Sequence, residues 1–101
     1  MIDKDAVIVA QATALPGNEV ALRAAIDEVI PPSLAEAGVE VFRLHEDIEK
    51  PGHFVLYERF ANQAALDSHF SSSHFKKVVD AVTPLVGGGK PDITRLRQLT
   101  V

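Results

Sequence analysis

The sequence predicts an α+β fold, a ferredoxin-like four-stranded antiparallel sheet with helices on one face. Strand-like and helix-like segments follow one another in the order β-α-β-β-α-β, which is the order of the split β-α-β arrangement. The two central strands are joined by a short polar turn, residues 47–52, so they form an antiparallel hairpin. A length of 101 residues fits one domain, residues 1–101, with a single modest core.

The first strand and the first helix are predicted over residues 6–30. The segment AVIVAQAT, residues 6–13, is rich in β-branched residues, and Gln11 is its one strongly polar side chain. Asn18 is a suitable N-cap for the helix that follows. The apolar side of that helix is predicted from helical spacing to carry Leu22, Ile26, Val29 and Ile30.

Residues 31–38 are predicted to interrupt this helix. Pro31 and Pro32 each lack an N–H, and their rings clash with the preceding turn, so they should kink or end the helix. Residues 33–36, SLAE, have the pattern of a capping box and predict one more helical turn. We expect that turn to end at Gly38.

The two central strands are predicted at residues 39–46 and 53–60. Alternation assigns to one face of the earlier strand Val39, Val41, Arg43 and His45. It assigns to one face of the later strand Phe54, Leu56, Glu58 and Phe60. Alternation does not tell which face carries the helices, and therefore whether Glu58 or Arg43 faces a pocket.

Two further helices and a last strand complete the predicted domain. Asn62 caps a helix with His69 beside its apolar stripe, and residues 71–73, three serines, interrupt it. The next helix is predicted to end at Pro84 and the following glycines, and its apolar side carries Phe75, Val79, Val82 and Val86. Residues 91–101 are strand-like.

Both faces of the predicted sheet carry apolar side chains. One face has Val7, Val9, Val41 and Val55, and the other has Ile8, Phe42, Leu56 and Phe60. A single layer of helices covers only one of these faces, and the other would be a large exposed apolar patch. We therefore expect a homodimer that forms through the uncovered face of the sheet.

The composition excludes several classes of function. The absence of cysteine rules out disulfides, thiolate zinc sites, iron–sulfur clusters and cysteine nucleophiles. A formal charge of −4 with scattered Lys and Arg argues against a nucleic-acid partner. The start of the chain, MIDKDAV, does not resemble a signal peptide, and no apolar run approaches the ~18 residues of a membrane span. We expect a cytoplasmic protein with no membrane partner.

Four short motifs resemble one protein family when they are taken in order. They are A-x-A-x-P-G at residues 12–17, E-x-G at 36–38, Y-E-x-aromatic at 57–60, and A-L-x-x-H-x-x-S-x-H-F at 65–75. Together they resemble the antibiotic-biosynthesis-monooxygenase domain of the quinol-monooxygenase type, and the resemblance covers nearly the whole chain. It implies a dimeric α/β-barrel in which two ferredoxin-like units join sheet to sheet.

The resemblance also implies an activity: cofactor-independent oxidation of a quinol or polyphenol-like aromatic substrate by dioxygen. The family is functionally mixed, so two alternatives stay open. One is an isomerase or other proton-transfer enzyme acting on a small quorum-signal-like metabolite, and the other is a non-catalytic, ligand-binding stress-response dimer. Haem-degrading relatives carry an Asn, a Trp and a haem-binding His at positions that are here Ala10, His69 and Val79. We therefore expect neither haem degradation nor a cofactor.

His69, His74 and Glu58 are the candidate catalytic residues. Oxygenation without a cofactor needs a base with a pKa near the working pH, a dry pocket and a donor that stabilises an anion. His69 is favoured as the base, or is a core histidine bonded to the backbone. His74 begins a helix, whose positive end should keep it neutral, or it is a partly exposed cap residue. Glu58 should have a raised pKa if it is buried, or it pairs with an arginine.

Candidate substrate-binding residues are Phe42, Phe60, Phe70 and Gln11. The three phenylalanines would line the pocket, although core packing alone also explains them. His69 and His74 lie five apart across the serine break, which is not metal-binding spacing, and no acidic residue has such spacing to them. We expect no metal site, and we expect a small aromatic substrate and dioxygen as partners.

Overall fold

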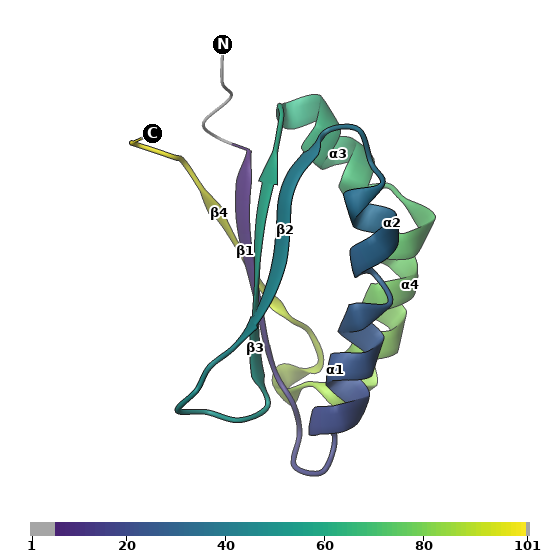
Figure 1. The fold of residues 1–101 in the computed structure, drawn as a ribbon. Helices are drawn as coiled ribbons and strands as arrows, with labels where there is room; N and C mark the ends of the chain where they lie inside the picture. The colour runs from purple at the N-terminus through teal and green to yellow at the C-terminus, as the bar shows by residue number, and fades with distance from the viewer. Residues whose placement is uncertain (1–5, 101) are drawn as a thin grey trace.

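A four-stranded sheet lies against one layer of helices in the computed structural model, which describes residues 6–100 (Figure 1). The strand order is β2-β3-β1-β4, and each neighbouring pair is antiparallel, so the predicted fold is confirmed. The elements are β1 (Val7–Thr13), α1 (Glu19–Asp27), α2 (Ile30–Leu34), β2 (Val39–Glu46), β3 (His53–Phe60), α3 (Gln63–Phe70), α4 (Ser73–Val82), the short 3₁₀ helices η1 (Thr83–Leu85) and η2 (Gly87–Gly89), and β4 (Asp92–Leu96).

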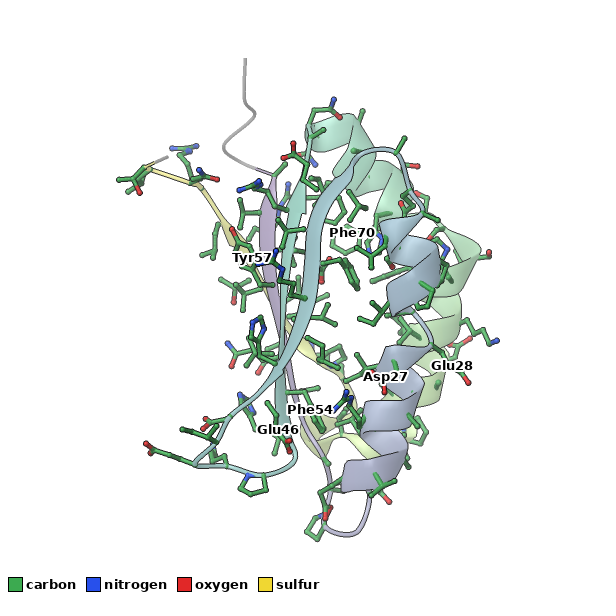
Figure 2. All side chains as sticks on the ribbon, viewed as in Figure 1. Asp27, Glu28, Glu46, Phe54, Tyr57 and Phe70 are labelled. Atoms are coloured by element: carbon green, nitrogen blue, oxygen red, sulfur yellow. The ribbon has the colours of Figure 1, made fainter. Side chains whose placement is uncertain are left out.

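Strand β3 shows which face of the sheet meets the helices. Its buried side chains are Phe54, Leu56, Glu58 and Phe60, and those between them are half-buried. Figure 2 shows Phe54 and Phe70 between the sheet and the helices, and Tyr57 on the opposite face. The register places Glu58 beside Ile8 of β1 and Phe42 of β2. Glu58 therefore points into the interior of the domain.

The apolar core is divided into two clusters. The larger lies between α1, α4 and the sheet and consists of Leu22, Ile26, Val29, Phe42, Phe54, Leu56, Val82 and Val86. The smaller consists of Ala6, Ile8, Phe60 and Leu66, beneath α3. Along β3, Leu56 belongs to the larger cluster and Phe60 to the smaller. Glu58 lies between these two residues, so a carboxyl group occupies the boundary between the clusters.

The helix interruption predicted at Pro31 and Pro32 is confirmed, because α1 ends at Asp27 and α2 begins at Ile30. The two prolines lie in the first turn of α2, where a missing N–H costs no helical hydrogen bond. The predicted capping box at residues 33–36 is wrong, because Ser33 lies inside α2 and Glu36 follows that helix. Asn18 stands at the N-cap of α1, but its side chain makes no capping hydrogen bond.

Strand β2 contains an irregularity that strict alternation misses. The register shifts between Val39 and Val41, which leaves Glu40 as an extra residue. Val39 pairs with Phe60 and packs on the core, whereas Val41 pairs with Arg59 on the other face. The prediction that Val39 and Val41 share a face is therefore wrong, since one added residue breaks the period of two.

The serine break between α3 and α4 is confirmed. Asn62 caps α3, because its Oδ1 accepts a hydrogen bond from the Ala65 N–H at 2.9 Å. Ser72 caps α4 through its Oγ, which accepts from the Phe75 N–H at 3.2 Å and donates to the His69 carbonyl at 2.6 Å. This one hydroxyl joins the end of α3 to the start of α4.

The C-terminal part of the domain is shorter in regular structure than the sequence predicts. Helix α4 ends at Val82, and η1 and η2 carry the chain to β4. The predicted last strand extends to Val101, a residue outside the described range, whereas β4 itself ends at Leu96. Among residues 6–100, no helix has the length and apolar character that crossing a membrane requires.

A Gly38→Ala substitution should destabilise the fold by about 1–3 kcal/mol, the usual cost of overpacking. A Cβ at Gly38 would overlap the Cβ of Ala65 in α3. Adding Ala65→Gly should recover much of the loss, because the nearest remaining atom is the Ala65 Cα at 3.4 Å. Urea unfolding of both single variants and of the double variant measures this coupling.

The control for this experiment is Gly87→Ala, where the nearest atom to an added Cβ is 3.8 Å away. It should change the free energy of unfolding much less than Gly38→Ala. Equal stability of Gly38→Ala and the wild type would contradict the close packing of this loop on α3.

Candidate active site

A mostly apolar cavity lies between the sheet and the helices. Its volume is about 660 Å³ with the open space at its mouth included. Side chains from all the strands and from α1, α3 and α4 contribute to its wall. Glu58 and His69 are the titratable residues of the wall within the described chain. The cavity therefore presents an acid and an imidazole to an otherwise apolar space.

His69 lies in the middle of an aromatic cage. Its side chain is 2% exposed, and its ring centroid is 5.3–5.8 Å from those of Phe42, Phe60, Phe70 and Phe75. Two of these phenylalanines come from the sheet and two from the helices. The cage excludes water from most of the imidazole ring, so the polar partners of that ring determine its chemistry.

Glu36 is the polar partner of both candidate histidines. A single oxygen, Glu36 Oε2, lies 2.7 Å from His69 Nδ1 and 2.7 Å from His74 Nε2. An ionised carboxylate only accepts hydrogen bonds, so each of these ring nitrogens carries the proton. The free ring nitrogens are then His69 Nε2 and His74 Nδ1. Glu36 thereby fixes the tautomer of both imidazoles.

Glu58 lies on the opposite side of the His69 ring. Its Oε1 is 3.7 Å from His69 Nε2, longer than a hydrogen bond, and has no hydrogen-bond partner among residues 6–100. Burial raises the pKa of Glu58 from 4.5 to about 8, and the nearby Glu36 carboxylate adds to this increase. Glu58 is therefore a neutral carboxylic acid at pH 7 and has a proton to donate.

The structure brings together the three predicted catalytic residues, His69, His74 and Glu58. The contacts of His69 and Glu58 differ from those expected of a backbone-bonded core histidine and of an arginine-paired glutamate. His69 bonds a carboxylate through its ring instead of the backbone, and the charged neighbours of Glu58 are a histidine and Glu36, with no arginine among the described contacts. His74 is partly exposed, with 22% of its side chain accessible.

The predicted substrate-binding residues have different positions. Phe42 and Phe70 line the cavity, and Phe60 contacts the His69 ring from the smaller core cluster. Gln11 borders the cavity, but its Oε1 lies 2.9 Å from His53 Nε2 on the other face of the sheet. The side-chain amide of Gln11 therefore points away from His69 and Glu58.

Glu36 is the site residue that the sequence interpretation missed. It is 33 positions from His69, and local patterns placed it in a capping box. The signal that points to it is the E-x-G motif, residues 36–38. Gly38 lets the loop approach α3 closely, and the carboxylate two residues earlier then reaches both histidines.

Glu36, His69 and His74 also form a group whose donor atoms all lie within 4.8 Å of one another. No spacing argument in the sequence identified this acidic neighbour of the histidines. Two ligands of a tetrahedral zinc ion, with bonds of ~2.0–2.1 Å, lie about 3.3 Å apart. Here the carboxylate oxygen is 2.7 Å from each ring nitrogen, which is a hydrogen-bonding distance. We therefore interpret the trio as hydrogen-bonded side chains.

The chain is similar to known proteins over most of its length. Residues 6–81 match the family model described as antibiotic biosynthesis monooxygenase. Rv0793 of Mycobacterium tuberculosis, which has a provisional monooxygenase name, is 37% identical over 68 residues. That match covers 67% of this chain and 66% of Rv0793.

Solved structures show the same fold. The structure of Rv0793 superposes with a TM-score of 0.88 at 32% identity and covers 94% of this chain and 95% of its own. PA3566 from Pseudomonas aeruginosa has a TM-score of 0.84 at 30% identity and covers 93% of each chain. SO0527 from Shewanella oneidensis has a TM-score of 0.84 at 28% identity, with 91% and 88% covered. With its fold, motifs and family model in agreement, this chain belongs to the antibiotic biosynthesis monooxygenase family.

Proposed function

We propose that this protein is a cofactor-independent monooxygenase that oxidises a quinol or polyphenol-like aromatic substrate with dioxygen. The observation that carries the proposal is the His69 imidazole, held by Glu36 at 2.7 Å within an aromatic-lined cavity. An oriented, desolvated imidazole is the type of base that deprotonation of a phenol needs. Family membership supports a monooxygenase reaction, and the substrate class is our inference.

His69 acts as the base in the proposed reaction. Its Nε2 takes the phenolic proton, and the Glu36 carboxylate stabilises the imidazolium that forms. The resulting phenolate is rich enough in electrons to reduce dioxygen. One hydroquinone and one dioxygen give one hydroxyquinone and one water, so one oxygen atom enters the ring and the other leaves as water. The substrate supplies all four electrons, and no external reductant is needed.

Glu58 acts as the hydrogen-bond donor of the proposed site. Its raised pKa of about 8 keeps it protonated at neutral pH, and its Oε1 is unpaired within the described chain. A neutral acid in an apolar wall can donate to an oxyanion or peroxide as negative charge develops. His69 and Glu58 would thus take opposite roles on one substrate.

Proton transfer without oxidation is a second candidate function. His69 Nε2 and Glu58 Oε1 are only 3.7 Å apart in one cavity, so one group can remove a proton while the other supplies one. An isomerase acting on a small metabolite would use this pair and turn over its substrate without consuming oxygen. A non-catalytic, ligand-binding dimer would bind in the cavity and show no turnover.

We also propose a homodimer that forms through the face of the sheet turned away from the helices. That face carries the half-buried side chains Val9, Val41, Val55 and Tyr57, together with Leu96, which is 40% exposed. No helix of the described chain covers it (Figure 1). A second copy would remove this apolar surface from water. The cytoplasmic location remains a prediction from the sequence.

Oxygen consumption tests the enzymatic proposal. Incubating the wild type with a panel of hydroquinones should give oxygen uptake above buffer and a hydroxyquinone product. His69→Ala should lower the rate at least about 100-fold, the usual contribution of a general base. Ser68→Ala, at an exposed neighbour on α3, should retain the wild-type rate. Uptake that is absent from the wild type, or unchanged in His69→Ala, would refute the assignment.

The raised pKa of Glu58 has a consequence for stability. The folded state keeps the Glu58 proton up to about pH 8, whereas the unfolded chain loses it near 4.5. The protonated carboxyl thus adds stability that is complete below pH 4.5 and is lost as the pH rises to 8. Relative to Glu58→Gln, the wild-type free energy of unfolding should fall by about 1.4 kcal/mol per pH unit between pH 5 and 8.

Urea unfolding across this pH range measures the difference. The control, Glu49→Gln in the exposed β2–β3 turn, should follow the wild type in parallel. If the wild-type and Glu58→Gln curves also run in parallel, Glu58 is ionised at neutral pH and cannot be the proposed donor.

Sedimentation velocity at micromolar concentration tests the proposed dimer. The wild type should sediment as a dimer, and Val9→Lys should dissociate it, because the new charge would lie inside the apolar interface. Val20→Lys on α1, at a position that is 84% exposed, should leave the dimer intact. A wild-type monomer would rule out this interface.

A further inference from the structure

A row of polar groups crosses the helix layer from the cavity to the outer surface. His69 is 2% exposed at the cavity, Glu36 follows with 18%, and His74 is 22% exposed. His74 also lines a second depression, between α1, α2 and α4, with Glu28 and Lys77 at its edge. Figure 2 shows Glu28 on the side of the helices that faces away from the sheet. The row therefore connects two separate spaces.

The two free ring nitrogens lie at opposite ends of this row. Both N–H groups point at Glu36 Oε2, so His69 Nε2 is free at the cavity and His74 Nδ1 is free on the ring that lines the outer depression. Each histidine can therefore gain a proton on the ring nitrogen that does not bond Glu36, and its hydrogen bond to Glu36 stays intact. A proton has no need to pass through the carboxylate.

The charges of the row limit how many protons it holds. One Glu36 carboxylate neutralises one imidazolium, and the two ring centroids are only 5.8 Å apart. Two imidazolium ions at this separation repel each other, so the presence of a proton on one ring affects its binding to the other. The second proton binds less readily than the first. Protonation of one ring therefore favours deprotonation of the other.

We propose that Glu36 couples His69 and His74 into a proton relay between the cavity and solvent. In the resting state His69 is neutral and His74 is the imidazolium, with protons on both Nε2 and Nδ1. When His69 Nε2 takes a proton from the substrate, the N–H bond at His74 Nδ1 breaks and its proton passes to water on the outer side. One proton enters and one leaves, so the row keeps a constant charge. Formation of the product water takes the proton back from His69, and His74 regains one from solvent, which restores the resting state. This inference rests on the proposed function, in which His69 is the base, and it makes Glu36 a positioning residue.

Other titratable groups face this row from the surrounding elements. Glu58 of β3 lies at the inner end, where β1 and β2 present the apolar side chains Ile8 and Phe42. Glu28, which follows α1, and Lys77 of α4 line the outer depression, and their effects on the charge of His74 oppose each other. Glu36 is thus the carboxylate that both rings share.

Nitrogen-15 NMR of the histidine rings tests the relay without requiring a substrate. In the wild type, His69 should show a proton on Nδ1, and protonation of one ring should reduce protonation of the other. His74→Gln should increase the protonated fraction of His69 at a given pH, because the competing imidazolium is lost. Glu36→Gln should decrease that fraction and end its dependence on residue 74. Glu49→Gln should leave the protonation of both rings unchanged.

Several outcomes would overturn the relay. One is a protonated fraction of His69 that is the same in His74→Gln and the wild type at every pH, with both proteins folded by circular dichroism. That result would leave Glu36 with a purely structural role. Another is the appearance of intense visible absorption bands on adding Co²⁺ alone, lost in Glu36→Gln, which would show that the trio binds a metal.

Kinetics separates the relay from the proposed function. If the wild type consumes oxygen, Glu36→Gln and His74→Gln should each lower kcat at least tenfold with little change in KM. Unchanged kcat in both variants would overturn the relay while His69 remained the base. Absence of any oxygen uptake would instead refute the proposed function, and the NMR titrations would still decide whether the two rings are coupled.

Discussion

One carboxylate oxygen holds two imidazole rings from two different helices, and the arrangement of the site depends on that contact. Glu36 follows α2, a helix of five residues that is too short to be stable alone. Its hydrogen bonds to His69 on α3 and His74 on α4 are charge-assisted and short. They connect three consecutive helices of the layer at a single atom, and the same atom orients the imidazole that faces the cavity.

The core and the site share the same space. Glu58 lies between two apolar clusters, where a leucine or phenylalanine would pack without loss of solvation. Burial there keeps the carboxyl group neutral, and that neutrality makes it a donor instead of a second base. The phenylalanines that exclude water from His69 are also core residues. Stability and chemistry therefore constrain the same side chains.

Local sequence patterns predicted most of the fold. The bounds of β2 and β3 agree with prediction, as do the Asn62 cap and the serine break, because each depends on a few neighbouring residues. The four-stranded sheet follows from the order of these elements. Errors arose where one residue changes a period, at Glu40, or where a local pattern occurs away from a helix start, as in the predicted capping box at residues 33–36.

The candidate site was predictable only in part. His69, His74 and Glu58 were identified because polar groups stood out among aromatic residues in one stretch of the chain. Glu36 was not, because the contact that defines its role spans 33 positions, and a local capping pattern offered a competing explanation. The contact of the Gln11 amide with His53 was not predicted, because alternation shows that residues differ in face but not which face is inside.

The contact between Gly38 and Ala65 has a consequence for the evolution of this chain. The two positions share a space that holds a single methyl group, and that close approach brings the Glu36 loop to the helix that carries His69. The combined side-chain volume of the two positions limits which substitutions they accept, more than the polarity of the side chains does. Among related sequences, an increase in size at one position should be accompanied by a decrease at the other, so covariation of the pair would record the distance that the site requires.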